Sequence, residues 1–283
     1  FPMLKALAPQ QLDKVFFLTA KTPGRKLALD ASQVLFDQAQ HLPLRVLEMV
    51  ARDKACEHPD KACHGESCPL AKGFYDRLPA ARQAASRINL LDQAAMREVA
   101  RQHTVCPYYL SQEMARWADV VVADYNYYFD FSALLFGLAQ LNQWKVAVLA
   151  DEAHNLVERG RSMYSASLDQ AALVSVRKSA PEALKKSLQR VNREWNALHQ
   201  PQLAPYQAYD KAPEKLLQAV SLCSAAIGDY LNDHPQGLDS ALQTFYFDML
   251  QFGRVAELFD EHYLFAISKR DLERKRPLSQ LCL

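Results

Sequence analysis

The stretch "KVAVLADEAHNL", residues 145–156, decides the fold that this sequence predicts. It alternates β-branched and small apolar residues as far as Ala150, which is typical of a buried strand in a parallel sheet. The stretch then becomes polar at Asp151 and Glu152, and a helix start follows directly. Acidic side chains at the carboxyl end of a strand lie where open α/β sheets bind ligands. The stretch therefore predicts an α/β fold with a ligand site just after this strand.

Three earlier apolar runs have the same character: "KVFFLTA" at 14–20, "LRVLEMVA" at 44–51 and "DVVVADY" at 119–125. Helical spacing follows the first of them from Gly24 onward. Alternation of buried strands and helices predicts a parallel sheet with helices on its faces.

The pattern changes after the acid pair. One helical face is apolar in the middle of this region, at Leu184, Leu188, Val191, Trp195 and Leu198. The segments 213–234 and 238–259 repeat the pattern, and no strand is visible until "HYLFAIS" at 262–268. We therefore predict an all-helical insert from about residue 156 to 260.

Three of the six cysteines crowd into one polar stretch, "CEHPDKACHGESCPLAKG" at 56–73, and a further cysteine follows in "TVCPYYLS". Six cysteines are too few and too unevenly spread for a disulfide scaffold, which favours a reducing cytoplasm. In that compartment clustered thiols indicate metal binding. The predicted ligands are Cys56, Cys63, Cys68 and Cys106.

Their spacing, C-x₆-C-x₄-C-x₃₇-C, leaves the metal open. Structural zinc sites usually contain paired C-x₂₋₄-C knuckles, whereas an iron–sulfur cluster also takes four thiolates with less constrained spacing. His58 and His64 flank the thiols and could ligate, but four cysteines already suffice. Cys223 and Cys282 lie in apolar patterns, so we interpret them as core residues.

Composition excludes several classes of protein. The 283 residues carry a net charge of +1, so no global basic field indicates a nucleic-acid partner, and any such surface must be local. No run reaches the ~18–20 apolar residues of a membrane span. Nothing resembles an export leader, so we expect a cytoplasmic protein with no membrane contact. The chain starts at Phe1 without a methionine, which predicts a beginning inside a domain.

These motifs occur in an order that resembles the XPD/DinG family of iron–sulfur superfamily 2 DNA helicases, in its bacterial DinG-like branch. "VAVLADEAHN" resembles the DEAH box, "FLTAKTPGRKLA" resembles motif Ia, and "CPYYLSQEMARWADVVVADYNYYFD" resembles the passage from the last cluster ligand into the motor. The resemblance implies a RecA-like motor domain over 1–50 and 111–155. It also implies a [4Fe–4S] domain over 51–110, a helical Arch over 156–268 and a return into the motor over 269–283.

The resemblance also implies roles for the acids. Asp151 would hold Mg²⁺ through water, Glu152 would polarise the water that attacks ATP, and His154 would couple the nucleotide site to a second motor domain. A bare acid pair would equally suit the first turn of any helix. The whole string, rather than the pair, favours phosphate chemistry.

DNA contacts follow in the same way. Thr19, Lys21 and Thr22 end a strand, where hydroxyls and a cation suit phosphate contacts. Asn126 and Tyr127 follow another strand, where an aromatic ring could stack on a base or simply pack in the core. Four further cations could line a DNA path or lie on solvated helix faces: Lys72, Arg77, Arg82 and Arg87.

The sequence departs from the family in two respects: it contains no G-x-x-x-x-G-K-[ST] phosphate loop, and the motifs of the second motor domain are also absent. We therefore expect a fragment of an ATP-dependent 5′–3′ DNA helicase, with a role in DNA repair, that does not hydrolyse ATP by itself. Its expected partners are single-stranded or forked DNA and ATP, with protein partners at the Arch. The alternative is a non-catalytic zinc-binding module for nucleic acid or protein.

Overall fold

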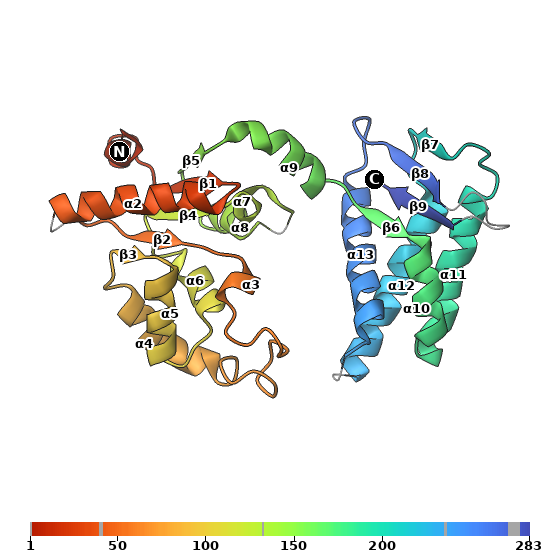
Figure 1. The fold of residues 1–283 in the computed structure, drawn as a ribbon, viewed down its shortest axis with the longest axis horizontal. Helices are drawn as coiled ribbons and strands as arrows, with labels where there is room; N and C mark the ends of the chain where they lie inside the picture. Colours follow the sequence, from red (N-terminus) through yellow and green to blue (C-terminus); the bar gives the residue numbers. More distant parts are fainter. Residues whose placement is uncertain (1, 40–41, 132, 235–236, 271–277) are drawn as a thin grey trace. The chain divides into compact units, whose positions relative to one another are not determined.

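The structure is a computed structural model that describes residues 2–39, 42–131, 133–234, 237–270 and 278–283. The chain divides into two compact units, Phe1–Met163 and Tyr164–Leu283 (Figure 1). Each unit has its own sheet and its own helices, and each is described by itself below.

The first unit is built on a five-stranded parallel sheet in the order β3-β2-β4-β1-β5. Its strands are β1 (Lys14–Thr19), β2 (Val46–Glu48), β3 (Leu90–Leu91), β4 (Val120–Asp124) and β5 (Val146–Ala150). The four strands predicted in this region and the α/β fold class are confirmed. The short edge strand β3 was not predicted, because two leucines are too few to show a strand period.

Helices cover both faces of this sheet. They are α1 (Pro2–Ala6), α2 (Thr22–Gln38), α3 (Arg52–Ala55), α4 (Phe74–Ala85), α5 (Gln93–Gln102), α6 (Pro107–Met114), α7 (Asn126–Phe129), α8 (Leu134–Leu141) and α9 (Leu156–Met163). A single 3₁₀ turn, η1 (Ala153–Asn155), precedes α9. Apolar residues of α1 and α2 pack on the face that carries Val15 and Val120.

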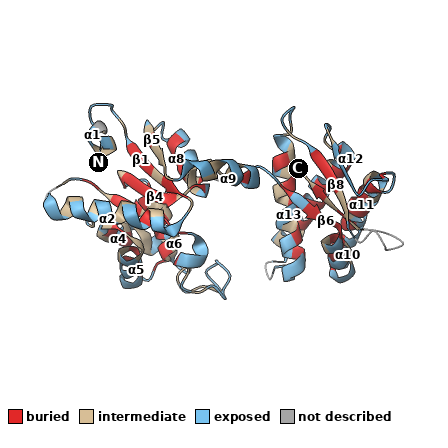
Figure 2. Ribbon diagram, turned by 45° about the horizontal axis from the view of Figure 1, so that its top comes forward, coloured by how far each residue is buried: buried red, intermediate tan, exposed pale blue. Residues whose placement is uncertain are grey.

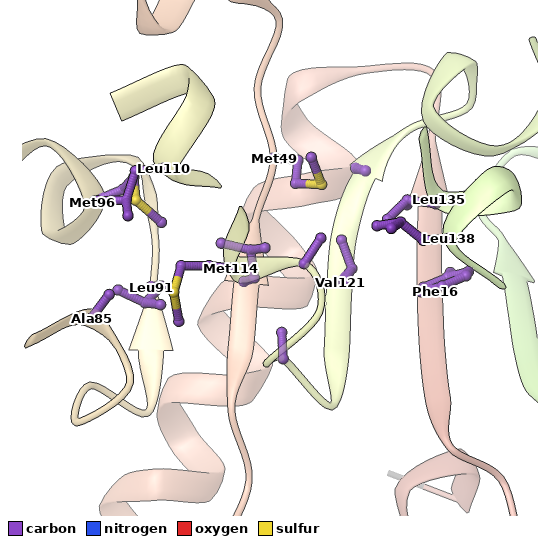
Figure 3. Close-up of a cluster of buried hydrophobic side chains, with 14 of the residues drawn as sticks. Phe16, Met49, Ala85, Leu91, Met96, Leu110, Met114, Val121, Leu135 and Leu138 are labelled. Atoms are coloured by element: carbon purple, nitrogen blue, oxygen red, sulfur yellow. The ribbon is translucent and has the colours of Figure 1, made fainter. Parts of the chain in front are cut away.

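The opposite face holds the larger core. There Phe16 and Val121 of the sheet belong to one buried cluster with Leu110 and Met114 of α6 and Leu135 of α8 (Figure 3). Successive strand residues point to opposite faces, which explains why neighbours such as Val15 and Phe16 belong to different clusters. Both faces are therefore closed, and the sheet offers its strand ends for function.

The second unit combines four helices with a four-stranded antiparallel sheet in the order β6-β9-β8-β7. The helices are α10 (Gln170–Ser179), α11 (Glu182–His199), α12 (Glu214–Asp233) and α13 (Ser240–Glu257). The strands are β6 (Ser167–Asp169), β7 (Tyr206–Tyr209), β8 (Phe265–Arg270) and β9 (Leu278–Cys282). In Figure 2 the buried faces of these helices and strands appear red.

The prediction that the insert is all-helical is wrong. The predicted helices over 184–198, 213–234 and 238–259 are present as α11, α12 and α13. However, β6 and β7 are three- and four-residue strands within the segment, too short for local periodicity to reveal. The sheet is held to the helices by a buried network, in which Trp195 Nε1 donates to Ser279 Oγ at 2.8 Å and the Ser279 N–H donates to Gln170 Oε1 at 3.0 Å.

The described part of the predicted return into the motor, 269–283, lies in the second unit instead. Residues 278–282 form β9, which pairs with both β8 and β6 and buries Ser279 and Leu281. Residues 271–277 lie outside the described residues. At the other end of the insert, α9 belongs to the first unit because Met163 packs into its core.

Among the described helices, none combines the length and the apolar character that a bilayer crossing requires.

Candidate active site

The carboxyl ends of the parallel strands bring the predicted site residues to one edge of the first sheet. Thr19 and Asp124 end β1 and β4 and are paired in register. Asp151 directly follows β5, and its N–H donates to the Leu18 carbonyl at 2.8 Å. The edge therefore carries two carboxylates and a hydroxyl at neighbouring strand ends, as expected for a ligand site of an α/β sheet.

Gly24 brings the first turn of α2 against this edge. A methyl group built on Gly24 would lie 2.4 Å from Thr19 Oγ1 and 2.5 Å from Asp151 Oδ2. Such distances are shorter than real contacts, so the absence of a side chain at Gly24 permits the close approach. The Asp151 carboxylate consequently lies beside the N-terminal turn of a 17-residue helix, where the helix dipole favours negative charge.

Tyr125 holds the backbone of Asp151 through a hydrogen bond. Its ring is fully buried and its hydroxyl donates to the Asp151 carbonyl. Burial raises the pKa of Tyr125, and the nearby Asp151 and Glu152 charges raise it further. The phenol therefore stays protonated and remains a hydrogen-bond donor at neutral pH.

Glu152 and His154 extend outward from the same edge. Both side chains are exposed, and His154 Nε2 lies 3.3 Å from Glu152 Oε2. Glu152 adopts a left-handed backbone conformation with φ 56°, which is uncommon for a residue with a side chain. This conformation lies at the N-terminus of η1. Backbone outliers of this kind cluster at functional sites.

The predicted DNA contacts at the end of β1 divide into two kinds. Thr19 is 1% exposed, and its hydroxyl accepts from the Lys21 N–H at 3.3 Å, so it shapes the turn from inside. Lys21 and Thr22 are exposed. Thr22 Oγ1 accepts from Arg25 Nη2 at 3.2 Å and from Lys54 Nζ at 3.3 Å.

Asn126 and Tyr127 line a groove of about 400 Å³ at the same edge, which we call the carboxyl-edge groove. The Tyr127 hydroxyl donates to the Val50 carbonyl at 2.8 Å, and burial raises the pKa of Tyr127. Asn126 Oδ1 accepts from Arg159 Nη2 at 3.1 Å, while the same nitrogen pairs with Asp124 at 2.7 Å. Tyr127 packs against the core and also lines the groove. Both predicted roles, core packing and stacking on a base, therefore stay open.

The groove contains cations that the sequence interpretation missed. Arg25, Arg52, Lys54 and Arg159 line it together with Asp124 and Asp130. Arg25 is 5% exposed, lies 3.6 Å from Glu48 and has a buried Nε without a hydrogen-bond partner among the described residues. Its position inside "FLTAKTPGRKLA" was visible, but a charged residue facing inward from a helix cannot be distinguished by spacing alone.

The four further candidate cations have separate environments, and only Arg77 and Arg82 lie on a helix, α4, whereas Lys72 and Arg87 lie in turns on either side of it. Lys72 and Arg87 are exposed. Arg77 Nη2 donates to the Lys72 carbonyl at 2.5 Å and braces the loop. Arg82 pairs with Glu113 at 3.0 Å and lies over the Trp117 ring. None of these four lines the carboxyl-edge groove.

Three of the four predicted metal ligands influence one another. Burial raises the pKa of Cys106, backbone hydrogen bonds from Tyr109 and Tyr108 lower it, and the Cys56 and Cys63 thiols raise it again. Arg52 Nη1 lies 4.0 Å from the Cys63 sulfur. Cys56 ends α3 and Cys106 begins α6, so two short helices place them.

The donor set suits an iron–sulfur cluster in its chemistry, because such clusters take thiolates and no residue between positions 56 and 80 is buried. Within the described ranges, however, no three His, Cys, Asp or Glu side chains lie close enough together to hold a metal ion. The four cysteines thus remain a prediction, with Cys68 the least connected to the others.

A parallel sheet with a carboxylate after β5 and a helix N-terminus against it is the arrangement of an α/β domain that binds ligands at its strand ends. The DEAD_2 family model matches residues 31–173, and the chain belongs to this family. The XPD/DinG-type resemblance is thereby confirmed.

Several curated proteins are similar in sequence. A regulator of telomere elongation helicase 1 homolog from Anopheles gambiae is 30% identical over 142 residues, 45% of this chain and 14% of that protein. A Fanconi anemia group J protein homolog from Gallus gallus is 23% identical over 201 residues, covering 65% and 16%. The ATP-dependent DNA helicase CHL1 of Saccharomyces cerevisiae is 34% identical over 88 residues, covering 31% and 10%. The chain thus matches only 10–16% of the length of these relatives.

Solved structures share the fold. A truncated XPD matches with a TM-score of 0.53 at 15% identity, covering 94% of this chain and 75% of its own. An XPD helicase matches with a TM-score of 0.52 at 14% identity, covering 96% and 46%. The five-stranded parallel sheet thus has the organisation of a RecA-like domain.

Proposed function

We propose that these residues form part of an ATP-dependent DNA helicase that moves 5′ to 3′ along single-stranded DNA and unwinds duplexes. The observation that carries the proposal is the place of the Asp151 carboxylate, after β5 and against Thr19 and Gly24. The direction of movement rests on the resemblance to the XPD/DinG family alone. The named similarity to DNA helicases supports the activity.

In this proposal the two acids divide the work at ATP. Asp151 holds Mg²⁺ through water, and its backbone is fixed by Tyr125 and β1 so that the carboxylate keeps its position. Glu152 is more exposed and has a left-handed backbone, which suits a group that polarises the attacking water. His154, 3.3 Å from Glu152, couples the nucleotide site to a second motor domain.

In such motors the phosphate loop and its lysine cradle the β- and γ-phosphates of ATP. Because no such loop occurs in the 283 residues, we expect the chain by itself neither to bind ATP tightly nor to hydrolyse it. The acids act only in a protein that also contains the loop.

The carboxyl-edge groove is the proposed path for single-stranded DNA in this unit. Arg52 and Lys54 offer charge to phosphates, and Tyr127 and Tyr108 offer aromatic surface in the same groove. Lys21 and Thr22 are exposed and precede Arg25 of the groove in the chain, and the Thr22 hydroxyl accepts a hydrogen bond from Lys54. Thr19 supports the turn and is not itself a contact, because its hydroxyl is buried.

We also propose that Cys56, Cys63, Cys68 and Cys106 hold a [4Fe–4S] cluster. The segment has no buried residue between positions 56 and 80, so metal binding would contribute folding free energy directly. Bound there, the cluster cross-links α3, the loop and α6. This role needs no redox step.

The test of the proposal is made in a longer version of the protein that includes a phosphate loop. Glu152→Gln keeps the shape of the side chain but removes its charge, and we expect ATP hydrolysis stimulated by single-stranded DNA to fall by roughly 100-fold or more. Unwinding of a duplex with a 5′ single-stranded tail should disappear with it.

The matched control is Glu158→Gln on α9, an exposed acid paired with Arg161. It should hydrolyse ATP and unwind like the parent protein. Normal unwinding by Glu152→Gln would refute the assignment of the acid, and unwinding only from a 3′ tail would refute the direction.

A further inference from the structure

The second unit carries a surface groove that the helicase proposal does not use. It lies between α11 and α12, which pack side by side (Figure 1), and encloses about 720 Å³. We call it the α11–α12 groove. Its rim is formed by Lys186, Arg190 and Arg193, and its floor by Ala219 and Leu222.

The three cations share one stripe of α11, because their spacing of four and three residues repeats the helical turn. Like charges at this spacing repel each other, so the stripe does not stabilise the helix. Lys186 and Arg190 have no ion pair within the part of the chain that the structure describes, and Arg193 pairs only with its own neighbour Glu194, at 2.9 Å. The described residues that line the groove include no carboxylate. An anionic partner would relieve this repulsion.

The floor of the groove is aliphatic. Leu222 is 47% exposed although it lies in the middle of α12, and the adjacent Ala219 and Cys223 are buried beneath it. A half-exposed leucine beside a cavity offers apolar contact area to a side chain of a partner. No aromatic ring occurs among the described lining residues, so the groove lacks a platform on which nucleic-acid bases would stack.

We infer that the α11–α12 groove docks an acidic segment of another protein, with an apolar side chain of that segment seated on Leu222. Acidic residues of the partner would pair with Lys186 and Arg190, which sets orientation and association rate, while the apolar side chain supplies buried area. Charge complementarity and the aliphatic floor favour a peptide over a nucleic-acid strand. The inference is independent of the helicase activity.

The experiment measures fluorescence anisotropy of a labelled peptide made of aspartates and glutamates around one central leucine, with the full chain titrated in at low salt. We expect saturable binding that weakens about tenfold in the double variant Lys186→Glu, Arg190→Glu. Leu222→Ser, or an alanine in place of the peptide's leucine, should weaken binding by about threefold. The milder pair Lys186→Gln, Arg190→Gln repeats the test if the charge reversal disturbs folding, which circular dichroism monitors.

The matched control is Lys211→Glu, Lys215→Glu, which changes the net charge of the same unit equally at exposed residues that do not line the groove. It should leave binding within about twofold of the parent. The inference is overturned if the peptide does not bind, if the control weakens binding as much as the groove variant, or if oligothymidine of equal charge binds more tightly and loses that binding in the groove variant.

Discussion

Gly24 is the residue on which the geometry of the candidate active site depends most closely. It has an ordinary helical place in α2, yet any side chain there would meet Thr19 and Asp151 at 2.4 and 2.5 Å. Of these two neighbours, Thr19 is buried and fixed within its turn, whereas the Asp151 carboxylate is partly exposed. A methyl group at Gly24 would therefore displace the carboxylate.

We predict that Gly24→Ala lowers the free energy of unfolding by about 1 kcal/mol, because overpacking outweighs the better helix propensity of alanine. Urea denaturation measures the change. The control is Gly137→Ala in α8, where no atom lies within 4 Å of the added methyl group. That substitution should raise stability by about 0.5–1 kcal/mol. A stabilising effect at both positions would contradict the prediction, because it would show that Thr19 and Asp151 can move away from the added methyl group at little cost.

Lys14 is the second residue whose setting has a measurable consequence. It begins β1, is 6% exposed, and donates from Nζ to the carbonyls of Ala118 at 2.5 Å and Arg116 at 3.0 Å. Its ammonium group lies 4.3 Å from the centre of the Trp144 ring. Burial lowers the pKa of Lys14 from 10.5 to about 8, against the opposing effect of Asp119.

The lowered pKa predicts how stability depends on pH. Between about pH 8 and 10.5 the unfolded chain keeps the Lys14 proton while the folded chain loses it, so the unfolded state binds more protons. The free energy of unfolding should therefore rise with pH in this window, by about 1–3 kcal/mol from this group. Lys14→Met should lack this part of the rise in urea titrations across the window. Parallel pH profiles for the two proteins would contradict the prediction.

The strand-end position of the acids was predictable from the sequence, but the orientation of single polar side chains was not. The string around Asp151 was sufficient to place the acids at a strand end, because strand period and polarity change are local. Thr19 was predicted to face a ligand and is instead buried, and Arg25 was missed although it lies within the same motif. Which way a polar side chain turns depends on the packing of α2 on the sheet, and spacing does not contain that information.

At the scale of elements, residues 56–73 between α3 and α4 are the longest connection described in the first unit. This connection runs through three cysteines and has no buried residue, although α4 packs into the core through Ala81 and Ala85. Its described backbone hydrogen bonds are short-range turns, such as Cys68 N–H to the His64 carbonyl at 2.9 Å. Such a segment has little core to keep it ordered without a ligand.

We predict that Cys→Ser at position 56, 63, 68 or 106 removes bound iron and the brown colour, and speeds amide hydrogen exchange over residues 51–110. Protein prepared without oxygen is analysed for iron and zinc. The control is Cys282→Ser in β9, outside the segment, which should retain the metal. Iron retained in the four variants would refute the ligand set, and zinc in place of iron in the parent protein would refute the cluster.

Elements were predictable where a long apolar pattern surrounds them: β2 has only three residues, yet the apolar run 44–51 indicated it. The helices α4, α5, α6, α11, α12 and α13 follow apolar periods that the sequence displays openly. The strands β3, β6 and β7 have two to four residues, and their pairing partners lie far away in the chain. A short strand forms because a neighbouring edge is available, so its own residues are a weak signal.

At the scale of the whole molecule, two separate cores carry the fold. The first is built around β1 and β4, and the second contains the fully buried Trp195 of α11, bonded to Ser279 of β9. The sequence predicted five successive parts, whereas the structure has two compact units that meet in sequence at Met163 and Tyr164. The sequence pattern changes close to the boundary between the units. However, α9 is assigned to the first unit by the packing of Met163, and β9 to the second by its pairing with β6 and β8.

We predict that the two cores respond separately to damage. Trp195→Ala should destabilise the second unit by about 3–5 kcal/mol, because it leaves a cavity and removes the hydrogen bond that the Ser279 hydroxyl accepts from the indole. Hydrogen exchange should then speed up in α10–α13 and stay unchanged in β1 and β4. Leu110, which is fully buried in α6, provides the converse variant: Leu110→Ala should speed hydrogen exchange in the first unit alone. Loss of protection in both units from either change would show a single cooperative fold.

The left-handed backbone at Glu152 has a consequence for how this position can evolve. Glycine would adopt φ 56° more readily than glutamate, so the native residue is not the one that folding alone would select. Selection for stability alone would therefore favour glycine at position 152, which would remove a carboxylate from the site. Glu152 as the proposed catalytic carboxylate would thus be a stability–activity trade-off located in one torsion angle.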